Sequence, residues 1–557
     1  MSDLNKDLSR KFINYLDQKQ YKRLQFEADM LGEIEDQHPL IMFYYASSIY
    51  LNEASKNKDL LYASQLFEKV YTSNKKHLQS LYNMLAVSFK TKSFKNVMPL
   101  AIEAYEKNNN DPKLIEGLAR VNFYLGNRQD SLKLFKILYK MLPDKKEGRL
   151  PFISSLNYTS GITQEEYMKE CLNYNSILEK KYNIENNKNQ FNWNKSDKIN
   201  LAFLSADFKT HSVSHFLIDI LKKIDNSKFN IYLISNLKTV DQDNVSQDLK
   251  KLVFKWVDAY DFSDDDLTFY LRSLKLDFLI DLSGFTNGNR FEVLIRRCAK
   301  VQIEWLGYNN SLGAMNIDYL ISDKNLIKSN ETNLYKEDVL FMPNIWNALS
   351  APEKLPEIID KSNEKNSDFV FCSFNNFQKI SDRTIDVWSK ILNTTKSKLL
   401  LKNSLIGGED LKNNVLDKFI SKGLQKDQII FLEREKNIYD HLKLYNKANV
   451  ALDTFPYPGV TTSYEAMLMG LPVLTMQGFN FNSRCGESIN KNVIMDNLIA
   501  KDDHDYLNIA ISLTKDLKLN EKYGENLRKK ALSSPLFNTD QFTRDFEELI
   551  TKIYNKN

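Results

Sequence analysis

Two hydroxyl groups and a carboxylate stand at the start of one predicted helix. Thr461, Thr462 and Glu465 follow a loop rich in proline and glycine, Thr454–Gly459, which itself follows the apolar run Val450–Leu452. The run predicts a buried strand and the loop a break before the helix. Amide groups at a helix start are unpaired and carry a partial positive charge, which suits a phosphate. We interpret this turn as a cradle for a nucleotide diphosphate, with Glu465 placed to reach a ribose hydroxyl.

The same spacing has a purely structural alternative. Thr462 and Glu465 fit a capping box, which stabilises a helix and binds no ligand. Gly470 ends the helix, and Pro472–Met476 predicts a second strand. A strand, loop, helix and strand in this order form a βαβ unit, whose ligands bind beyond the carboxyl ends of the strands. The location favours a ligand site, while the spacing alone leaves the capping box open.

Two of the six histidines lie close together after the predicted strand Ile199–Ser205. Asp207, His211 and His215 follow it, at the carboxyl end of the first predicted sheet. His211 could act as a general base or orient a substrate hydroxyl, because imidazole titrates near neutral pH. As an alternative, His211 and His215 could form a metal pair, but the sequence offers no third ligand. For His215 we prefer packing at the start of a helix.

Two further side chains follow predicted strands of a second sheet. Lys379 comes after Phe369–Ser373, where a cation could neutralise a leaving diphosphate. Its alternative is an ordinary surface lysine beside a helix start. His441 follows Ile429–Leu432 and could pack on a base or sugar, or could simply be a histidine on a helix face.

The composition indicates a globular protein without a strong charge. The 557 residues suit three or four domains, and 42% of them are hydrophobic. The 76 basic and 72 acidic residues leave a net charge of +4, which gives no reason to expect nucleic acid or an acidic membrane as a partner. The four cysteines are far apart, and neither an apolar signal segment nor a run long enough to span a membrane occurs. We expect a cytoplasmic protein.

Residues 1–185 predict an all-helical solenoid. A period of 34 residues brings Phe67, Ala101 and Phe135 into register. A helix–turn–helix repeat of this length is typical of tetratricopeptide repeats, and about three to four units are expected. Such a solenoid could hold a peptide in its concave groove, or could serve only as a stalk.

Beyond the polar linker Ile184–Ser196, strands alternate with helices twice, on either side of a second linker at Ser350–Ser367. This alternation predicts two doubly wound domains facing each other across a cleft. We place the first Rossmann-like domain at 197–348, the second at 367–530 and a final helix at 531–557.

The chain resembles the O-linked N-acetylglucosaminyltransferase family, which includes the SPINDLY fucosyltransferases and bacterial relatives. The resemblance covers about residues 40–557 and rests on seven ordered blocks, which are LSADFKTHSVSH, DLSGFTNGNR, VQIEWLGY, IDYLISD, FCSFNNFQKIS, NVALDTFPYPGVTTSYEAMLMGLPVLTM and SSPLFNTDQFT. It implies tetratricopeptide repeats joined to an α/β GT-B region of two Rossmann-like domains. The second of these domains would bind the nucleotide sugar and the first would lie on the acceptor side.

The resemblance also implies roles for single residues. His211 matches the histidine next to the acceptor and the sugar, long considered for the base. The donor side matches at Lys379 and Asn376 near the diphosphate, Thr461 and Thr462 beside it, Glu465 at the ribose and His441 at the nucleobase. Three positions depart from the family pattern, namely Val460 in place of a histidine, Asn309–Asn310 in place of Pro-Gly, and Glu465 in place of an aspartate. These departures leave open which sugar is transferred and which nucleobase the donor carries.

The resemblance predicts an inverting, metal-independent transfer of a sugar from a nucleotide sugar, with UDP-GlcNAc as first choice, to Ser or Thr hydroxyls of proteins. No cofactor is expected, and the acceptor would be a protein or peptide, held by the repeats. The alternatives are another donor or acceptor on the same fold, such as GDP-fucose or a glycan, and a non-catalytic scaffold.

Overall fold

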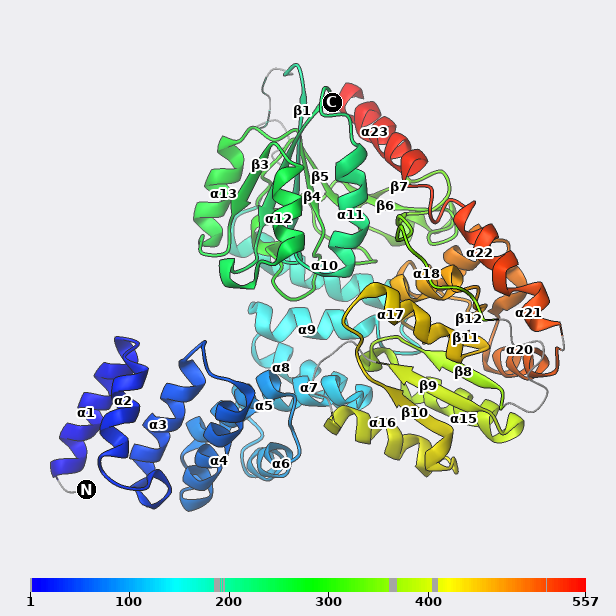
Figure 1. Cartoon of the computed structure of the whole chain (residues 1–557). Coiled ribbons are helices and arrows are strands. Elements are labelled where there is room, and N and C mark those ends of the chain that lie inside the picture. Colours follow the sequence, from blue (N-terminus) through cyan, green and yellow to red (C-terminus); the bar gives the residue numbers. More distant parts are fainter. Residues whose placement is uncertain are drawn as a thin grey trace. The chain divides into compact units, whose positions relative to one another are not determined.

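The computed structural model describes residues 3–184, 191, 193, 196–359, 368–402, 409–516 and 518–556 (Figure 1). Contacts within the chain divide it into two compact units. One contains Met1–Met141 and Leu405–Asp417, and the other contains Leu142–Ser404 and Lys418–Asn557. Among the described helices, none is both long and apolar enough to cross a membrane.

The first unit is a stack of helices in pairs. Phe67, Ala101 and Phe135, which the 34-residue period brought into register, are all buried, so the period marks the packed face. One pair begins after Asp111, whose carboxylate caps α7, and Gly126 ends that helix in a left-handed conformation. The helices of this unit are α1 (Asp3–Asp17), α2 (Tyr21–Asp29), α3 (Pro39–Leu51), α4 (Asn57–Ser73), α5 (Leu78–Thr91), α6 (Val97–Lys107), α7 (Pro112–Leu125) and α8 (Arg128–Met141).

A helix from far along the sequence also packs on this unit. The amino-terminal part of α16 (Glu409–Ser421) belongs to it. The Asp410 carboxylate accepts a hydrogen bond from the Lys95 amide at 2.9 Å, and Asn414 Nδ2 donates to the Leu125 carbonyl at 2.6 Å. The predicted domain boundaries placed this helix in the second Rossmann-like domain, because nothing in its sequence indicates that it packs on the repeat helices.

The second unit contains two fully parallel sheets, with strand orders β3-β2-β1-β4-β5-β6-β7 and β10-β9-β8-β11-β12-β13. The first sheet consists of β1 (Ile199–Ser205), β2 (Phe229–Ser235), β3 (Lys255–Asp258), β4 (Phe278–Asp281), β5 (Val301–Glu304), β6 (Tyr319–Ser322) and β7 (Asp338–Phe341). The second consists of β8 (Val370–Ser373), β9 (Lys398–Lys402), β10 (Ile429–Leu432), β11 (Val450–Leu452), β12 (Val473–Met476) and β13 (Ile499–Ala500). Buried strands were predicted, whereas the edge strands β3, β7 and β13 were missed because they are short or carry charged ends.

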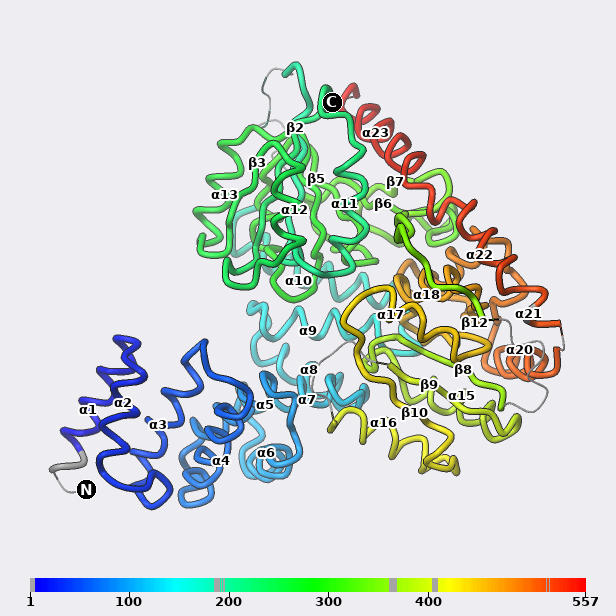
Figure 2. Tube along the Cα trace, in the orientation of Figure 1, coloured from blue at the N-terminus to red at the C-terminus, as the bar shows by residue number. Residues whose placement is uncertain are grey.

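Helices alternate with these strands as predicted. Those of the first sheet are α11 (Ser212–Lys223), α12 (Asn244–Lys251), α13 (Asp264–Ser273) and α14 (Phe291–Leu294). Those of the second are α15 (Asp382–Thr395), α17 (Ile438–Lys443), α18 (Thr461–Leu468), α19 (Cys485–Asn492), α20 (Asp503–Lys515), α21 (Leu519–Lys522) and α22 (Gly524–Leu532). The final helix α23 (Thr539–Lys556) returns to the first sheet, as the red end of the trace shows in Figure 2, and Phe546 stacks there on Trp305 with ring centroids 5.2 Å apart.

Two helices before the first sheet, α9 (Lys146–Leu156) and α10 (Gln164–Lys181), belong to this second unit. The contact boundary after Met141 therefore lies earlier than the predicted domain boundary near 185. Gln164 Nε2 donates to Asn310 Oδ1 at 2.9 Å, and Asn480 Nδ2 donates to Gln164 Oε1 at 3.2 Å. The start of α10 thus bonds to loops of both sheets. Asn310, which departs from the Pro-Gly of the family pattern, therefore has a hydrogen-bond partner in Gln164.

Candidate active site

Both predicted clusters lie where the strand order of a sheet reverses. β1 and β4 are neighbours in the first sheet, and β8 and β11 are neighbours in the second. Such a switch point leaves a crevice beyond the carboxyl ends of the strands, where ligands of doubly wound sheets bind. Asp207 and His211 follow β1, whereas Lys379 follows β8 and the Thr454–Gly459 loop follows β11.

Asp453 organises the loop between β11 and α18. Its side chain is buried, and its Oδ1 accepts hydrogen bonds from the Gly459 amide at 2.6 Å and from Asn375 Nδ2 at 3.0 Å. Its Oδ2 accepts one from Thr475 Oγ1 at 2.8 Å. Burial raises the pKa of Asp453 to about 6, although these hydrogen bonds favour the charged form. The carboxylate therefore fixes the loop to both neighbouring strands.

Lys379 is half-buried against this loop. Its Nζ donates to the Pro458 carbonyl at 2.8 Å and lies 4.2 Å from the centroid of the Tyr457 ring. Burial lowers the pKa of Lys379 to about 8, and the nearby Asp453 carboxylate opposes this shift. Such placement differs from that of an ordinary surface lysine, because one amine proton is fixed by the loop while two remain for a ligand.

The capping-box alternative is wrong. No side chain caps the amino end of α18. Thr462 Oγ1 instead donates to Asn375 Oδ1 at 2.6 Å. Gly459 permits this approach, since a Cβ at that position would lie 2.4 Å from Thr462 Oγ1. The helix start with its two threonines remains available for a negatively charged group.

Glu465 and His441 meet one turn further along α18. His441 Nε2 and the Tyr445 hydroxyl both lie 3.0 Å from Glu465 Oε2. The Tyr445 ring packs against Phe374, with centroids 4.4 Å apart. The structure thus brings together His441 and Glu465, which were predicted at the base and ribose ends of one nucleotide.

His211 belongs to the first sheet. It caps α11, where Nδ1 accepts a hydrogen bond from the Val213 amide at 3.3 Å and lies 3.7 Å from the Asp207 carboxylate. One turn later, Phe216 packs edge-on against Tyr464 of α18, with centroids 5.6 Å apart. The two switch points therefore adjoin through α11 and α18, although no direct contact joins His211 to Lys379 in the described hydrogen bonds and ion pairs.

His215 lies on α11, one turn after His211. The surrounding protein lowers its pKa, while the Glu465 carboxylate raises it and the His211 ring lowers it further. Glu465 of the second sheet is thus close enough to act electrostatically on the first. The described part of the chain holds no group of three or more side chains that could bind a metal, so the His211–His215 pair has no third ligand.

The remaining predicted residues have simple local roles in the structure. Asn376 Oδ1 accepts the Gln378 amide at 3.0 Å, while its neighbour Asn375 makes the contacts to Asp453 and Thr462. Val460 precedes α18 and is half-buried. Sequence reasoning missed Asn375, Asp453, Lys402 and Tyr445, because buried polar residues carry no motif of their own. The first three follow predicted strands, which was the available signal, whereas Tyr445 lies in η7 (Leu444–Lys447) and had none.

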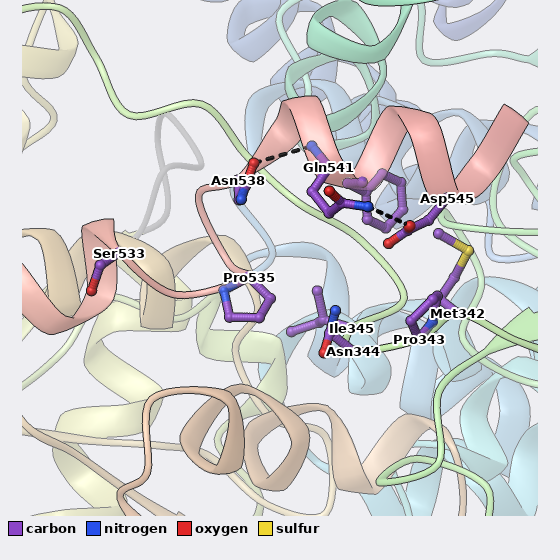
Figure 3. Close-up of a pocket in the computed structure, with 10 residues that line it drawn as sticks. Met342, Pro343, Asn344, Ile345, Ser533, Pro535, Asn538, Gln541 and Asp545 are labelled. Carbon is purple, nitrogen blue, oxygen red and sulfur yellow. Dashed lines mark hydrogen bonds between the residues drawn. The ribbon is translucent and has the colours of Figure 1, made fainter.

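Two small cavities are candidate ligand sites, and neither matches the predicted site. One of about 10 Å³ lies beneath Thr462 between Asn375 and Tyr445, and it has room for no more than a water molecule. Another of about 110 Å³ lies between the residues after β7 and the α22–α23 connection (Figure 3). There Gln541 Nε2 donates to the Asp545 carboxylate at 2.7 Å, and no predicted site residue lines the cavity.

The fold agrees with comparisons to known proteins. The model of glycosyl transferase family 41 matches residues 155–368 and 360–546, and the chain belongs to this family. It is 28% identical over 361 residues to the "Probable UDP-N-acetylglucosamine--peptide N-acetylglucosaminyltransferase SPINDLY" of Solanum lycopersicum, covering 64% of this chain and 39% of that protein. The protein of the same name from Arabidopsis thaliana is 28% identical over 363 residues, covering 64% and 40%. The chain thus spans well under half the length of these relatives.

Among solved structures, the chain resembles a mutant of the Thermobaculum terrenum O-GlcNAc transferase. The TM-score is 0.79 at 22% identity, and the match covers 93% of this chain and 98% of the other. This likeness confirms the predicted fold, in which a helical repeat region precedes two Rossmann-like domains of the GT-B kind.

Proposed function

We propose that this chain transfers a sugar from a nucleotide sugar to Ser or Thr hydroxyls of proteins, with inversion at the anomeric carbon. The observation that carries the proposal is the half-buried Lys379 amine beside the uncapped start of α18. UDP-GlcNAc is our first choice of donor and a peptide our choice of acceptor, because the names of the tomato and Arabidopsis relatives specify both.

The reaction places its largest charge change at the diphosphate. The acceptor oxygen bonds to the anomeric carbon, the bond from that carbon to the diphosphate oxygen breaks, and the electron pair leaves with the nucleotide. Lys379, the amides at the start of α18 and the Thr461 hydroxyl would stabilise that charge, with Thr462 contributing its backbone amide because its hydroxyl donates to Asn375. We propose that these groups do so without a metal ion, with Glu465 at the ribose, His441 at the base and Asn376 near the phosphates.

The acceptor hydroxyl loses its proton in the same step, to an oxygen of the departing diphosphate or to water. His211 Nδ1 accepts a hydrogen bond from its own helix, so the neutral ring carries its proton on Nε2. In this state the ring can donate a hydrogen bond to a sugar or acceptor oxygen. This supports a role in orienting the substrate over a role in removing the acceptor proton. The helical repeats would hold the peptide, and the four cysteines, all buried and none in a disulfide, suit a cytoplasmic setting.

A donor panel tests the proposal. The purified chain is incubated with lysate proteins and UDP-GlcNAc, GDP-fucose or UDP-glucose, and modified proteins are identified by mass spectrometry. We expect a mass increase of one N-acetylhexosamine on Ser or Thr with UDP-GlcNAc, and none with Lys379→Ala. A deoxyhexose increase with GDP-fucose would replace the donor but keep the reaction. Absence of any product together with absence of nucleotide binding would leave only the scaffold alternative.

A further inference from the structure

A buried amine stands behind the predicted ribose contact. Lys402 ends β9, and only 6% of its surface is exposed. Its Nζ lies within hydrogen-bond distance of His441 Nδ1 and 5.9 Å from the centroid of the Phe374 ring. The charged groups that face it are the carboxylates of Glu465 and Glu435 and the guanidinium of Arg434, and burial lowers the pKa of Lys402.

The contact fixes where the imidazole proton lies. An ammonium group has three donors and no acceptor, so His441 Nδ1 must accept from Lys402. The ring proton is then on Nε2, which donates to Glu465 Oε2 at 3.0 Å. The Tyr445 hydroxyl donates to the same oxygen, also at 3.0 Å. Two donors therefore hold Oε2, and Oε1 is left to accept a hydrogen bond from a ligand.

We propose that Lys402 is a positioning residue for the donor, holding His441 in the Nε2–H tautomer so that Glu465 presents Oε1 to the ribose. The inference rests on the proposed function for its ligand, but the pairing of Lys402 with His441 does not. Without the amine, the ring proton can move to Nδ1. Nε2 would then face the Glu465 carboxylate with a lone pair, and Glu465 would lose one of its two holding donors.

The chain offers closely matched variants for a test. Lys402→Met keeps the length of the side chain and removes the donor, while Lys402→Arg keeps a cationic donor. Lys398→Met is the control, because Lys398 begins the same strand and pairs with Asp368 at 2.6 Å, away from the site. With six histidines in the chain, His441→Gln assigns the His441 signal in spectra of 15N-histidine-labelled protein.

Two measurements are compared across the variants. Nitrogen chemical shifts report the tautomer of His441 with no ligand present, and calorimetry reports the affinity for UDP. We expect the Nε2–H tautomer in wild type, Lys398→Met and Lys402→Arg, and its loss in Lys402→Met. We expect the Kd for UDP to rise about tenfold in Lys402→Met, by analogy with outer-shell partners of metal ligands, and Lys402→Arg to restore most of the affinity.

The outcomes separate the two proposals. An Nδ1–H ring in wild type, or an unchanged ring signal and UDP affinity in Lys402→Met, overturns the role of Lys402. If the ring signals behave as expected but wild type does not bind UDP, the nucleotide ligand and hence the proposed function fail, while the Lys402–His441 pairing stands.

Discussion

Asp453, at the carboxyl edge of the second sheet, is buried and bonded to its neighbours, whereas the predicted site histidine at that edge of the first sheet, His211, is exposed. Asp453 is 2% exposed and takes hydrogen bonds from several elements, while the His211 side chain is 45% exposed and bonds mainly within its own helix start. A rigid donor side suits a small, invariant ligand, because preorganised charge costs no rearrangement during reaction. An open acceptor side suits varied peptides.

Removing the central cation should have the largest effect. We expect Lys379→Ala to lower turnover by about 10²–10³, by analogy with the loss of one oxyanion donor. Rates under single-turnover conditions measure this, with Lys390→Ala as control because Lys390 is an exposed lysine on the following helix α15. Near-normal turnover with an intact fold would remove the role assigned to Lys379.

The first sheet holds a buried acidic pair whose effect should appear in stability. Asp281 and Glu304 are both fully buried, and neither Glu304 oxygen has a hydrogen-bond donor. Burial, together with the Asp281 charge, raises the pKa of Glu304, and burial raises that of Asp281 to about 6. We expect Glu304→Gln to stabilise the protein by about 2 kcal/mol at pH 7.5, because the amide can donate to Asp281.

The pH dependence of that effect follows from the sign of the shift. The folded pair binds protons more tightly than the unfolded chain, so its stability is greatest below the unfolded pKa values and is lost as the pH rises through about 6. The advantage of Glu304→Gln should therefore shrink at pH 5. Denaturant unfolding at both pH values measures it, with the exposed Glu548→Gln as control. An equal advantage at both pH values would contradict the raised pKa values of Asp281 and Glu304 in the folded protein.

Donor binding should weaken in alkaline solution. Because burial lowers the pKa of Lys379 to about 8, the fraction of free protein that carries the cation falls as the pH rises through 8. The Kd for UDP should rise about fourfold between pH 7 and pH 8.5 if only the cation binds. Lys379→Met should show no such dependence, and the same slope in that variant would assign it to another group.

Loss of the open histidine should have the smallest effect. We expect His211→Ala to slow transfer several-fold with an unchanged Kd for UDP, because the ring orients the acceptor and does not touch the donor cluster. His504→Ala, an exposed histidine on α20, is the control. An unchanged rate would exclude a role of His211 in transfer. A weaker affinity for UDP would show that His211 also affects donor binding, against the proposed separation of a donor side and an acceptor side.

Much of this arrangement could be predicted from the sequence, since buried strands are apolar runs and the loops after them carry the chemistry. The strand at Val450–Leu452 and the helix from Thr461 both followed from local rules. The capping box at Thr462 and Glu465 does not form, because Thr462 bonds to Asn375 in the loop after β8 and Glu465 bonds to Tyr445 of η7 (Leu444–Lys447). Lys402 was missed because burial of a lysine depends on tertiary packing.

The side-chain amide of Gln164 limits how far the two sheets can separate to admit a substrate. Its oxygen and nitrogen are each satisfied by a different sheet, through Asn480 and Asn310. Swinging the sheets apart would strip this buried side chain of one of its two partners, at about 1–3 kcal/mol for the unsatisfied group. If the chain is the proposed transferase, we expect nucleotide exchange to proceed mainly by local rearrangement of loops, with the two sheets held together.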